Sequence, residues 1–551
     1  MNPVLLEELK KQISGDVDVS TETLTVYNHD ASIFSLTPQV VVFPKNGDDV
    51  KALVKFVDQH KNDIPDLSLT ARAASTCMSG GGLSESIVIG FLKYFNHPAK
   101  IEGDLATVEP GIYYRDFEKQ TLEHNLLFPT YPSSREICAL GGMINNNCGG
   151  EKSLQYGKTE DWVRKMTMVL ADGNTYEFKP LNDRELQAKM KQADFEGEIY
   201  KKIYELLTTN YELIKHAKPA VTKNSAGYYL WNVYDKEKGV FDLTKLFVGA
   251  QGTLGLMLDA TVQLVPVKKH KEMLVIDLWD LSHLGQAINT ILPYAPESLE
   301  MYDDKTLKLA LKYFGGFGQK LGTSNIFSTF YQFLPEFMME LMHHLPKLVI
   351  QAEFTDDDVD GMNKKIAELE GKLQQFHPKL TLVPSEEKEK KYWLIRRESF
   401  SLLRGKIKDK YASPFIDDFV VNPEHLPEFL PKLNAIFAKY PSLIYTIAGH
   451  AGNGNFHIIP LMDIRDKTQQ DIIPKLSKEV FDLVISYKGS NSGEHNDGLI
   501  RTPFLEDMYG KEIVSLFEKT KDIFDPQGIF NPRKKVRGDM DFAMQHIRQN
   551  W

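Results

Sequence analysis

The stretch Arg72–Gly82, RAASTCMSGGG, directly follows an apolar segment, Asp66–Thr70, that is typical of a β-strand. A loop of small residues after a strand lets consecutive backbone N–H groups converge on an anion such as a pyrophosphate. Upstream, Val40–Phe43 predicts another strand, and residues 45–60 carry apolar side chains at the spacing of an amphipathic helix. Taken alone, the loop is equally consistent with an ordinary surface loop.

Two further clusters of small residues follow, each beside predicted strands. The first is Pro132–Ser134 with Gly141–Gly150, and the second is Gly249–Gly255. Between them, Val163–Leu170 predicts a strand and Ala171–Asn174 a hairpin turn. Three such clusters indicate a long ligand that the backbone approaches at several points.

The familiar nucleotide motifs do not account for these clusters. No G-x-G-x-x-G motif opens a predicted helix, and Lys152 stands where a P-loop ending at Gly157–Thr159 would need its leading glycine. The sequence therefore predicts neither a Rossmann dinucleotide site nor a Walker site.

The composition of the 551 residues is ordinary for a soluble globular protein, with 42% hydrophobic and 25% charged residues, and the length predicts two or three domains. The formal net charge of −10 argues against nucleic acid as the main partner. The three cysteines form no CxxC pair, so we expect no disulfide scaffold or iron–sulfur cluster. No segment approaches the roughly 18 apolar residues of a membrane span. We expect a cytoplasmic protein, soluble or at most peripheral at the inner face of the membrane.

A second informative stretch is Gly449–His457, GHAGNGNFH, in which two histidines flank a glycine-rich turn. The apolar segments on either side predict two short strands, and Gly452 and Gly454 permit the positive φ that a tight reversal needs. Folded across this turn, His450 and His457 can point at one spot, which suggests a divalent metal. We expect a third ligand in the segment that follows residue 492, where Glu494 is the best candidate.

In this order, the segments resemble the FAD-binding domain of the vanillyl-alcohol-oxidase and p-cresol-methylhydroxylase (PCMH-type) superfamily. The carboxyl-terminal half resembles the D-lactate, glycolate and D-2-hydroxyglutarate dehydrogenase branch, so the likeness covers residues 27–536. The resemblance implies an α+β fold with the following parts: a helical segment at 1–35, a two-part PCMH-type FAD-binding domain at 36–267, a FAD-linked oxidase C-terminal cap domain at 268–536 with a segment that returns to the flavin, and a tail at 537–551.

The resemblance implies FAD as the cofactor, and we expect it to be non-covalent because the first loop contains no histidine or other evident flavin tether. Ala73, Ala74 and Ser75 stand where the family usually has glycines, so the local backbone is expected to differ. The residues that the resemblance assigns to the cofactor are Arg72, Ser75, Thr76, Cys77, Met78, Ser79, Gly80, Gly81, Pro132, Ser133, Gly141, Gly142, Asn145, Asn146, Gly149, Tyr156, Gly157, Gly252, Thr253, Gly255 and Asn531.

The resemblance also implies oxidation of a D-2-hydroxy acid to the 2-oxo acid by hydride transfer to flavin. A divalent metal, Zn or Mn, would polarise the hydroxyl, and His495 would take the proton. Arg396, rather than its neighbour Arg397, is expected to hold the substrate carboxylate. Asp417-Asp418 matches an acidic segment whose structural or metal-linked role stays open. The predicted metal ligands are His450, His457 and Glu494.

Two departures bear on the substrate. Ile459 and Ile416 stand where the D-2-hydroxyglutarate enzymes carry an asparagine and a lysine, so polar groups for a second carboxylate are missing. D-lactate is therefore favoured, with glycolate or D-2-hydroxyglutarate as alternatives. The reduced flavin needs a separate acceptor, namely a quinone, a cytochrome or an electron-transfer protein. Two rival functions stay open: a metal-dependent hydrolase, and a non-catalytic flavin-binding electron-transfer subunit.

Three segments of the carboxyl-terminal half are expected to surround this site. Residues 361–376 and 424–438 predict amphipathic helices of the cap, and the glycine-rich segment 314–327 is expected to border the substrate entrance. The stretch 533–551, which includes the tail, mixes basic and apolar side chains. It fits either a peripheral membrane or partner contact, or a helix docked on its own domain.

Overall fold

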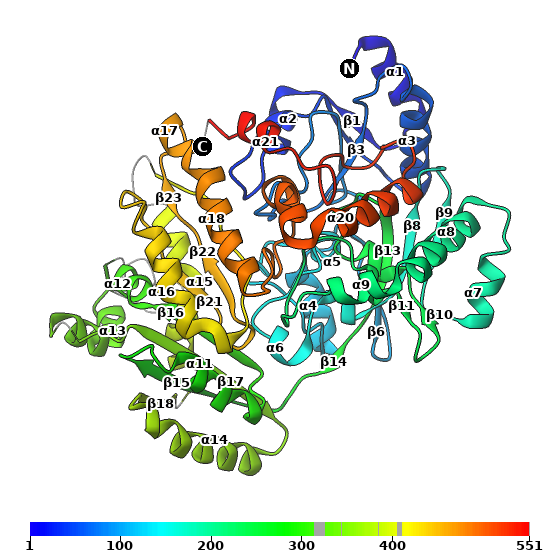
Figure 1. Cartoon of the computed structure of the whole chain (residues 1–551). Coiled ribbons are helices and arrows are strands. Elements are labelled where there is room, and N and C mark those ends of the chain that lie inside the picture. Colours follow the sequence, from blue (N-terminus) through cyan, green and yellow to red (C-terminus); the bar gives the residue numbers. More distant parts are fainter. Residues whose placement is uncertain (313–325, 343, 384, 405–409, 550–551) are drawn as a thin grey trace.

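The computed structural model of the chain describes residues 1–312, 326–342, 344–383, 385–404 and 410–549. They form two α+β domains that lie side by side, a flavin domain on the blue and cyan side and a cap domain in green to orange (Figure 1). This confirms the predicted fold class. Most of the loop expected at 314–327 lies outside the described residues, which resume at Ile326 with α13. Among the described helices, none is long and apolar enough to cross a bilayer.

The first part of the flavin domain is a sheet with the strand order β1-β2-β4-β3. β2 and β3 each pair in parallel with β4, whereas β1 pairs antiparallel with β2. Helix α3 (Gly47–His60) buries its apolar face in one cluster with this sheet, and the Asn46 side chain caps its first turn. The strands are β1 (Asp16–Asp18), β2 (Val40–Phe43), β3 (Leu69–Arg72) and β4 (Ile87–Gly90). The loop of small residues therefore leaves the end of β3, which lies slightly later than predicted.

The second part of the flavin domain is an antiparallel sheet with the order β5-β6-β13-β8-β9. The hairpin β8–β9 turns at residues 171–174, as predicted. The cluster Gly141–Gly150 begins inside the short helix α5 (Leu140–Asn146), and Gly249–Gly255 leads directly into β13. The strands are β5 (Lys100–Glu102), β6 (Leu105–Val108), β8 (Val163–Val169), β9 (Thr175–Phe178) and β13 (Leu256–Gln263).

The other elements of the flavin domain cover these two sheets and connect them. They are α1 (Pro3–Gln12), α2 (Thr21–Tyr27), α4 (Tyr114–Glu123), β7 (Leu126–Leu127), α6 (Ser153–Tyr156), β10 (Leu181–Asn182), α7 (Asp183–Lys189), α8 (Phe195–Thr209), α9 (Tyr211–Ala217), β11 (Tyr234–Asp235), β12 (Val240–Phe241), α10 (Thr244–Phe247) and β14 (Val265–Pro266).

The cap domain is built on a sheet with the order β18-β15-β17-β16-β21-β22-β20, antiparallel throughout. Successive residues of β15 alternate between two apolar clusters, because neighbouring side chains of a strand point to opposite faces. The strands are β15 (His270–Leu278), β16 (Ser298–Asp303), β17 (Leu348–Asp356), β18 (Lys379–Val383), β20 (Phe419–Val420), β21 (Ile447–His450) and β22 (Asn455–Ile458).

Helices cover both faces of the cap sheet. One face carries α11 (Leu284–Ile291), α14 (Val359–Leu373), α16 (Leu426–Phe437) and α18 (Ile472–Ser486). The other face carries α12 (Asp304–Lys312), α13 (Ile326–Leu341) and α15 (Glu386–Arg404). The helices predicted at 361–376 and 424–438 correspond to α14 and α16. Short elements complete the cap, namely β19 (Tyr411–Ala412), β23 (Leu461–Met462), α17 (Lys467–Gln470) and α19 (Gly498–Arg501).

The chain returns to the flavin domain through α20 (Leu505–Phe524), the orange-red helix labelled α20 in Figure 1. Phe530 then pairs in parallel with Leu69 at the free edge of β3. The tail forms α21 (Met540–Gln545), and Ile547 pairs with Phe34 of the amino-terminal segment. Because Ala543 and Ile547 are buried, the tail is docked on its own chain, as one of the two interpretations predicts.

The histidine hairpin differs in detail from the prediction. β21 includes His450 and β22 includes His457, so the reversal itself is a single 3₁₀ turn over residues 451–453. Gly454 has the positive φ of 62° that the turn requires, but Gly452 does not adopt a positive φ. The reason for a glycine at 452 is space, since a Cβ there would lie 2.7 Å from the side chain of Leu154.

Candidate active site

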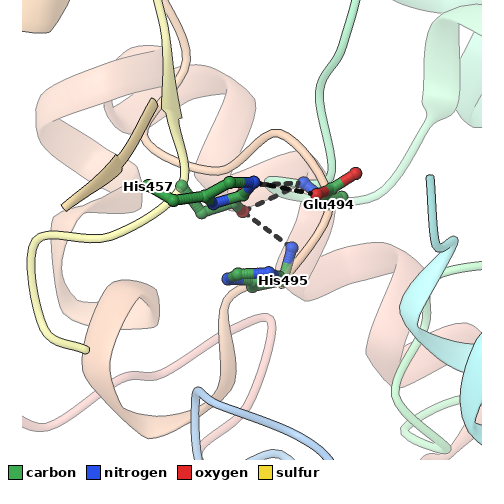
Figure 2. Close-up of side chains that lie close together, drawn as sticks. His457, Glu494 and His495 are labelled. Carbon is green, nitrogen blue, oxygen red and sulfur yellow. Dashed lines mark hydrogen bonds and ion pairs between the residues drawn. The ribbon is translucent and has the colours of Figure 1, made fainter. Parts of the chain in front are cut away.

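The hairpin brings the predicted metal ligands together. Oε1 of Glu494 lies 3.0 Å from Nε2 of His450 and 3.2 Å from Nε2 of His457. The two imidazole rings are 5.1 Å apart and nearly perpendicular. Figure 2 shows the ring of His457 facing the carboxylate of Glu494. Both imidazole nitrogens therefore meet one oxygen of Glu494, as the spacing of the two histidines across the turn predicts, although the group whose ligand atoms all lie within 4.8 Å of one another contains His457 and Glu494 but not His450.

Each of these imidazoles is oriented by a second carboxylate on its other nitrogen. Nδ1 of His450 lies 2.5 Å from Oε1 of Glu300, and Nδ1 of His457 lies 3.2 Å from Oδ1 of Asp417. Because Nδ1 donates its proton to this second carboxylate, Nε2 is the nitrogen that faces Glu494, as a donor in the metal-free protein and as the nitrogen available to a metal. Glu300 was not predicted as a site residue from the sequence. The signal that could have identified it is an acidic residue inside β16, a strand that is wholly buried.

The carboxylate of Glu494 is itself held on both sides. Lys223, which is almost fully buried, lies 3.3 Å from Oε2. Burial raises the pKa of Glu494, but the charges of Lys223 and His450 outweigh it and hold the pKa well below its usual range. Glu494 is therefore ionised, with Oε1 directed to the imidazoles and Oε2 to the lysine.

Asp418 positions the loop that carries Glu494 and His495. Its carboxylate accepts hydrogen bonds from the backbone N–H groups of both residues, at 2.9 and 2.7 Å, and from the hydroxyl of Ser492 at 2.8 Å. Asp418 lies close enough to join His457, Glu494 and His495 in a group of potential metal ligands. Because these hydrogen bonds already use its oxygens, we assign Asp418 to positioning rather than to ligation.

His495 lies against the same cluster, with a ring nitrogen near the carboxylate of Glu494. Its ring stacks on that of His457 at 5.1 Å, below it in Figure 2, and its Nδ1 lies 2.6 Å from Oδ2 of Asp417. Asp417 thus contacts His457 with one oxygen and His495 with the other. Nε2 of His495 is left as the nitrogen with a free lone pair.

The electrostatics of the cluster favour a positive charge at its centre. Burial lowers the pKa of His457, but hydrogen bonds to Asp417 and Glu494 outweigh burial and raise the pKa to about 9. Without an ion, this charge is carried by a proton on the imidazole. Two imidazole nitrogens and one carboxylate oxygen form a donor set that zinc or manganese accepts, and both imidazoles have carboxylates behind them. The residues therefore fit a divalent metal.

The three small-residue clusters line one large cavity, with a volume of about 170 Å³. Of the predicted cofactor residues, those on its wall are Arg72, Ser75, Thr76, Cys77, Met78, Gly81, Pro132, Ser133, Gly141, Gly142, Asn145, Asn146, Gly149, Gly252 and Gly255. Gly142 faces open space, because a Cβ there would meet no atom within 4 Å, so any larger side chain would extend into the cavity. A cavity walled by glycines and small side chains from three separate segments leaves backbone groups accessible to a cofactor such as FAD.

Six predicted cofactor residues do not line this cavity: Ser79, Gly80, Tyr156, Gly157, Thr253 and Asn531. Asn531 acts from behind the wall, since its amide donates hydrogen bonds to the carbonyl oxygens of Gly81 and Gln251, at 2.8 and 2.7 Å. Thr253 and Tyr228 share a hydrogen bond between their hydroxyls at 2.6 Å. Gln251, which lines the cavity, was not singled out in the sequence.

Arg72 ties the first loop to the amino-terminal segment. Its guanidinium donates to the backbone oxygens of Tyr27, Val26 and His29 and to the hydroxyl of Ser75. Most of its N–H groups are thereby used within the protein, so Arg72 shapes the cavity wall more than it supplies free donors to a ligand. Ser75 has a positive φ of 63°, in the region where the family usually places glycine.

A second cavity, of about 150 Å³, adjoins the first. Its wall is formed by Met78, Ser133, Thr306, Arg396, Arg397, Thr446, Ala448, His457, Ile459 and His495. Three of these residues, namely Met78, Ser133 and His495, also line the first cavity. His495 therefore stands between the two spaces.

Both arginines of this wall are paired. Arg396 donates from Nε to Oε2 of Glu300 at 3.0 Å, and Arg397 makes two hydrogen bonds to Glu151 through Nη2. Burial raises the pKa of Glu151, but Arg397 outweighs burial and lowers the pKa to about 2, so this pair is fully ionised. Arg396, whose terminal amino groups have no partner among the described residues, is the better anchor for a carboxylate.

The two isoleucines that distinguish this chain lie in different environments. Ile459 is on the wall of the second cavity, whereas Ile416 is fully buried in the main apolar cluster of the cap. Only Ile459 can therefore touch a ligand in that cavity directly.

Two domain models match the chain: residues 267–535 match the C-terminal domain of FAD linked oxidases, and residues 38–179 match an FAD binding domain. The D-2-hydroxyglutarate dehydrogenase of Pseudomonas putida is 27% identical over 97% of this chain and 52% of its own length, so the chain spans about half of that relative. The glycolate oxidase subunit GlcD of Bacillus subtilis is 28% identical, with 96% of each chain covered. The D-lactate dehydrogenase of Archaeoglobus fulgidus is 24% identical, over 90% of this chain and 91% of its own.

A solved structure of p-cresol methylhydroxylase with substrate bound superposes with a TM-score of 0.68. The match covers 98% of this chain and 97% of that one, at 12% sequence identity. At this identity, the likeness shows the fold.

Proposed function

Because the chain belongs to the FAD-linked oxidases with a PCMH-type FAD-binding domain, we propose that it oxidises a D-2-hydroxy acid to the 2-oxo acid, with D-lactate as the preferred substrate. The observation that carries this proposal is the position of His495, which lines both the cavity formed by the three small-residue clusters and the cavity with the two arginines. A base at that boundary reaches a substrate hydroxyl while the substrate carbon faces the flavin.

When bound, FAD accepts the hydride from the substrate carbon, and the divalent metal stabilises negative charge on the substrate oxygen. The residues of the chain prepare this reaction. His495, held at Nδ1 by Asp417, accepts the hydroxyl proton at Nε2. Arg396 binds the substrate carboxylate with its terminal amino groups, and His450, His457 and Glu494 hold the metal.

The wall of the second cavity supports a short substrate. Ile459 offers only an apolar surface there, and the charge of Arg397 is already balanced by Glu151. A second carboxylate would have to give up its hydration without a free cation to bind, which is costly. Glycolate and D-2-hydroxyglutarate are the alternative substrates.

The reduced flavin must pass its electrons to a separate acceptor, which we propose is a quinone, a cytochrome or an electron-transfer protein. We propose a cytoplasmic location, with any membrane contact limited to the inner face. The position of the base and the carboxylate anchor favours an enzyme over a non-catalytic flavin-binding subunit.

Anaerobic mixing of the purified yellow protein with D- and L-2-hydroxy acids, with and without a chelator, tests this function. We expect D-lactate to bleach the flavin absorbance and the chelator to prevent it. A flavin that no 2-hydroxy acid bleaches would favour the electron-transfer subunit. A colourless protein without flavin would favour a metal-dependent hydrolase.

Replacing Ile459 by asparagine is expected to shift the substrate preference toward dicarboxylates. The amide would supply a hydrogen-bond donor to a second carboxylate, and one such bond to a charged group is worth about 1.5–3 kcal/mol, or roughly 10- to 100-fold. The measurement is kcat/KM for D-2-hydroxyglutarate relative to D-lactate in Ile459→Asn. Ile416→Asn is not a suitable control because the Ile416 side chain is buried in the core. Ile459→Val, which keeps the wall apolar, serves as the control instead. An unchanged ratio in Ile459→Asn would contradict the assignment of this wall.

A further inference from the structure

Glu300 joins the two halves of the proposed substrate site. It lies on β16 directly opposite His450 of β21 in the sheet register. Its Oε1 lies 2.5 Å from Nδ1 of His450, and its Oε2 accepts a hydrogen bond from Nε of Arg396 at 3.0 Å. The residue is 1% exposed, so water does not compete for either oxygen. One buried carboxylate thus touches both a predicted metal ligand and the predicted carboxylate anchor.

We propose that Glu300 is a positioning residue that couples metal binding at His450 to carboxylate binding at Arg396. This inference rests on the proposed function, because it takes Arg396 as the anchor of the substrate carboxylate. It adds a specific consequence, namely that the metal and the carboxylate each strengthen the binding of the other through Glu300.

On the metal side, Glu300 selects the tautomer of His450. By accepting the Nδ1–H, it leaves the lone pair on Nε2, the nitrogen that faces Glu494 at 3.0 Å. A carboxylate behind an imidazole also makes that imidazole a stronger ligand. The strength of this effect depends on how much of the negative charge of Glu300 is available to His450.

On the substrate side, Glu300 occupies one edge of the Arg396 guanidinium through Nε. The terminal amino groups are left for a carboxylate, which can take them with two parallel hydrogen bonds. A carboxylate bound there neutralises part of the guanidinium charge, so Glu300 becomes a stronger acceptor for His450. By thermodynamic linkage, a bound metal then favours the carboxylate by the same factor.

The neighbouring pair of Arg397 and Glu151 offers a matched comparison. Arg397 lines the same cavity and is held by Glu151 at 2.5 Å, but the other contact of Glu151 is the hydroxyl of Tyr131 at 3.2 Å. No histidine contacts Glu151 among the residues that the structure describes. Glu151 therefore balances a cavity arginine without a link to the metal ligands.

The test measures the dissociation constant of zinc from the FAD-loaded protein by competition with a zinc-binding dye. Each titration is run with and without excess propionate, a carboxylate without a hydroxyl group that reaches Arg396 but offers no alcohol to the metal. In the unmodified protein, we expect propionate to tighten zinc binding. In Glu300→Gln, we expect zinc to bind about 10- to 100-fold more weakly and propionate to have no effect, because an amide cannot accept from both donors. Glu151→Gln removes a carboxylate from a cavity arginine without touching a metal ligand, so zinc alone should bind to this variant as tightly as to the unmodified protein.

The proposal is overturned if Glu300→Gln binds zinc within threefold of the unmodified protein, if propionate still tightens zinc binding in that variant, or if propionate has no effect on the unmodified protein. Glu300→Asp keeps the charge but is too short to reach both partners, so it should also lose the propionate effect. If Glu300→Gln does not fold, Glu300→Asp serves as the test variant in its place. The dye measurement needs no turnover, so failure of every 2-hydroxy acid to bleach the flavin would overturn the proposed function separately.

Discussion

Replacing Glu494 by glutamine is expected to remove the bound metal and to slow flavin reduction by D-lactate by about 10³-fold or more. The carboxylate oxygen of Glu494 lies 3.0 and 3.2 Å from the two imidazoles, whereas the oxygens of Asp418 are already used by backbone N–H groups and a hydroxyl. An amide oxygen binds a divalent cation much more weakly, and Lewis-acid stabilisation of the substrate oxygen is worth several kcal/mol. The measurements are metal content after dialysis and the anaerobic rate of flavin bleaching.

The lysine behind Glu494 requires a control in this experiment. Lys223 is 1% exposed and pairs with Oε2 of Glu494, so the single substitution leaves a buried ammonium without its carboxylate. Loss of a buried partner of this kind is itself strongly destabilising. The double variant Glu494→Gln with Lys223→Met removes both charges, and it should also lack metal while remaining folded. Full metal content in both variants would refute the ligand assignment. Glu512→Ala, at an exposed position on α20, is the control variant and should keep the metal.

The ligands of the candidate site could be predicted because their arrangement is local. His450 and His457 are joined by one tight hairpin, and the glycine at 454 supplies the backbone conformation that the turn needs. The small-residue loops could be predicted for the same reason, since each follows or precedes a strand that the sequence pattern identifies. Gly452 shows the limit of such reasoning: it was attributed to backbone conformation, but it is small because Leu154 of the other domain packs against it.

The residues that support the ligands could not be predicted from local pattern. Glu300 lies 150 positions before His450, and Lys223 lies 271 positions before Glu494. Their roles appear only when β16 pairs with β21 and when the flavin domain closes on the cap. The same holds for Asn531, which holds the cavity wall from a position 450 residues beyond Gly81. Long-range contacts of this kind depend on the whole topology.

Replacing His495 by alanine is expected to lower the anaerobic rate of flavin reduction by about 10²- to 10⁴-fold while leaving the metal and FAD contents unchanged, because general-base catalysis contributes on this scale. His495 is not one of the three predicted ligands His450, His457 and Glu494, and its loss leaves His457 on the other oxygen of Asp417. Burial lowers the pKa of His495, but the charges of Asp418 and Asp417 raise it above the ordinary value. The rate should therefore fall as the pH drops through this raised pKa, since only the neutral imidazole accepts a proton. The His495→Ala variant should not show this decrease at low pH.

The alanine also leaves space at the boundary of the two cavities, so added imidazole should restore part of the rate in His495→Ala. A rate within tenfold of the unmodified protein would assign the proton transfer elsewhere, and His216→Ala, at an exposed position, should change nothing.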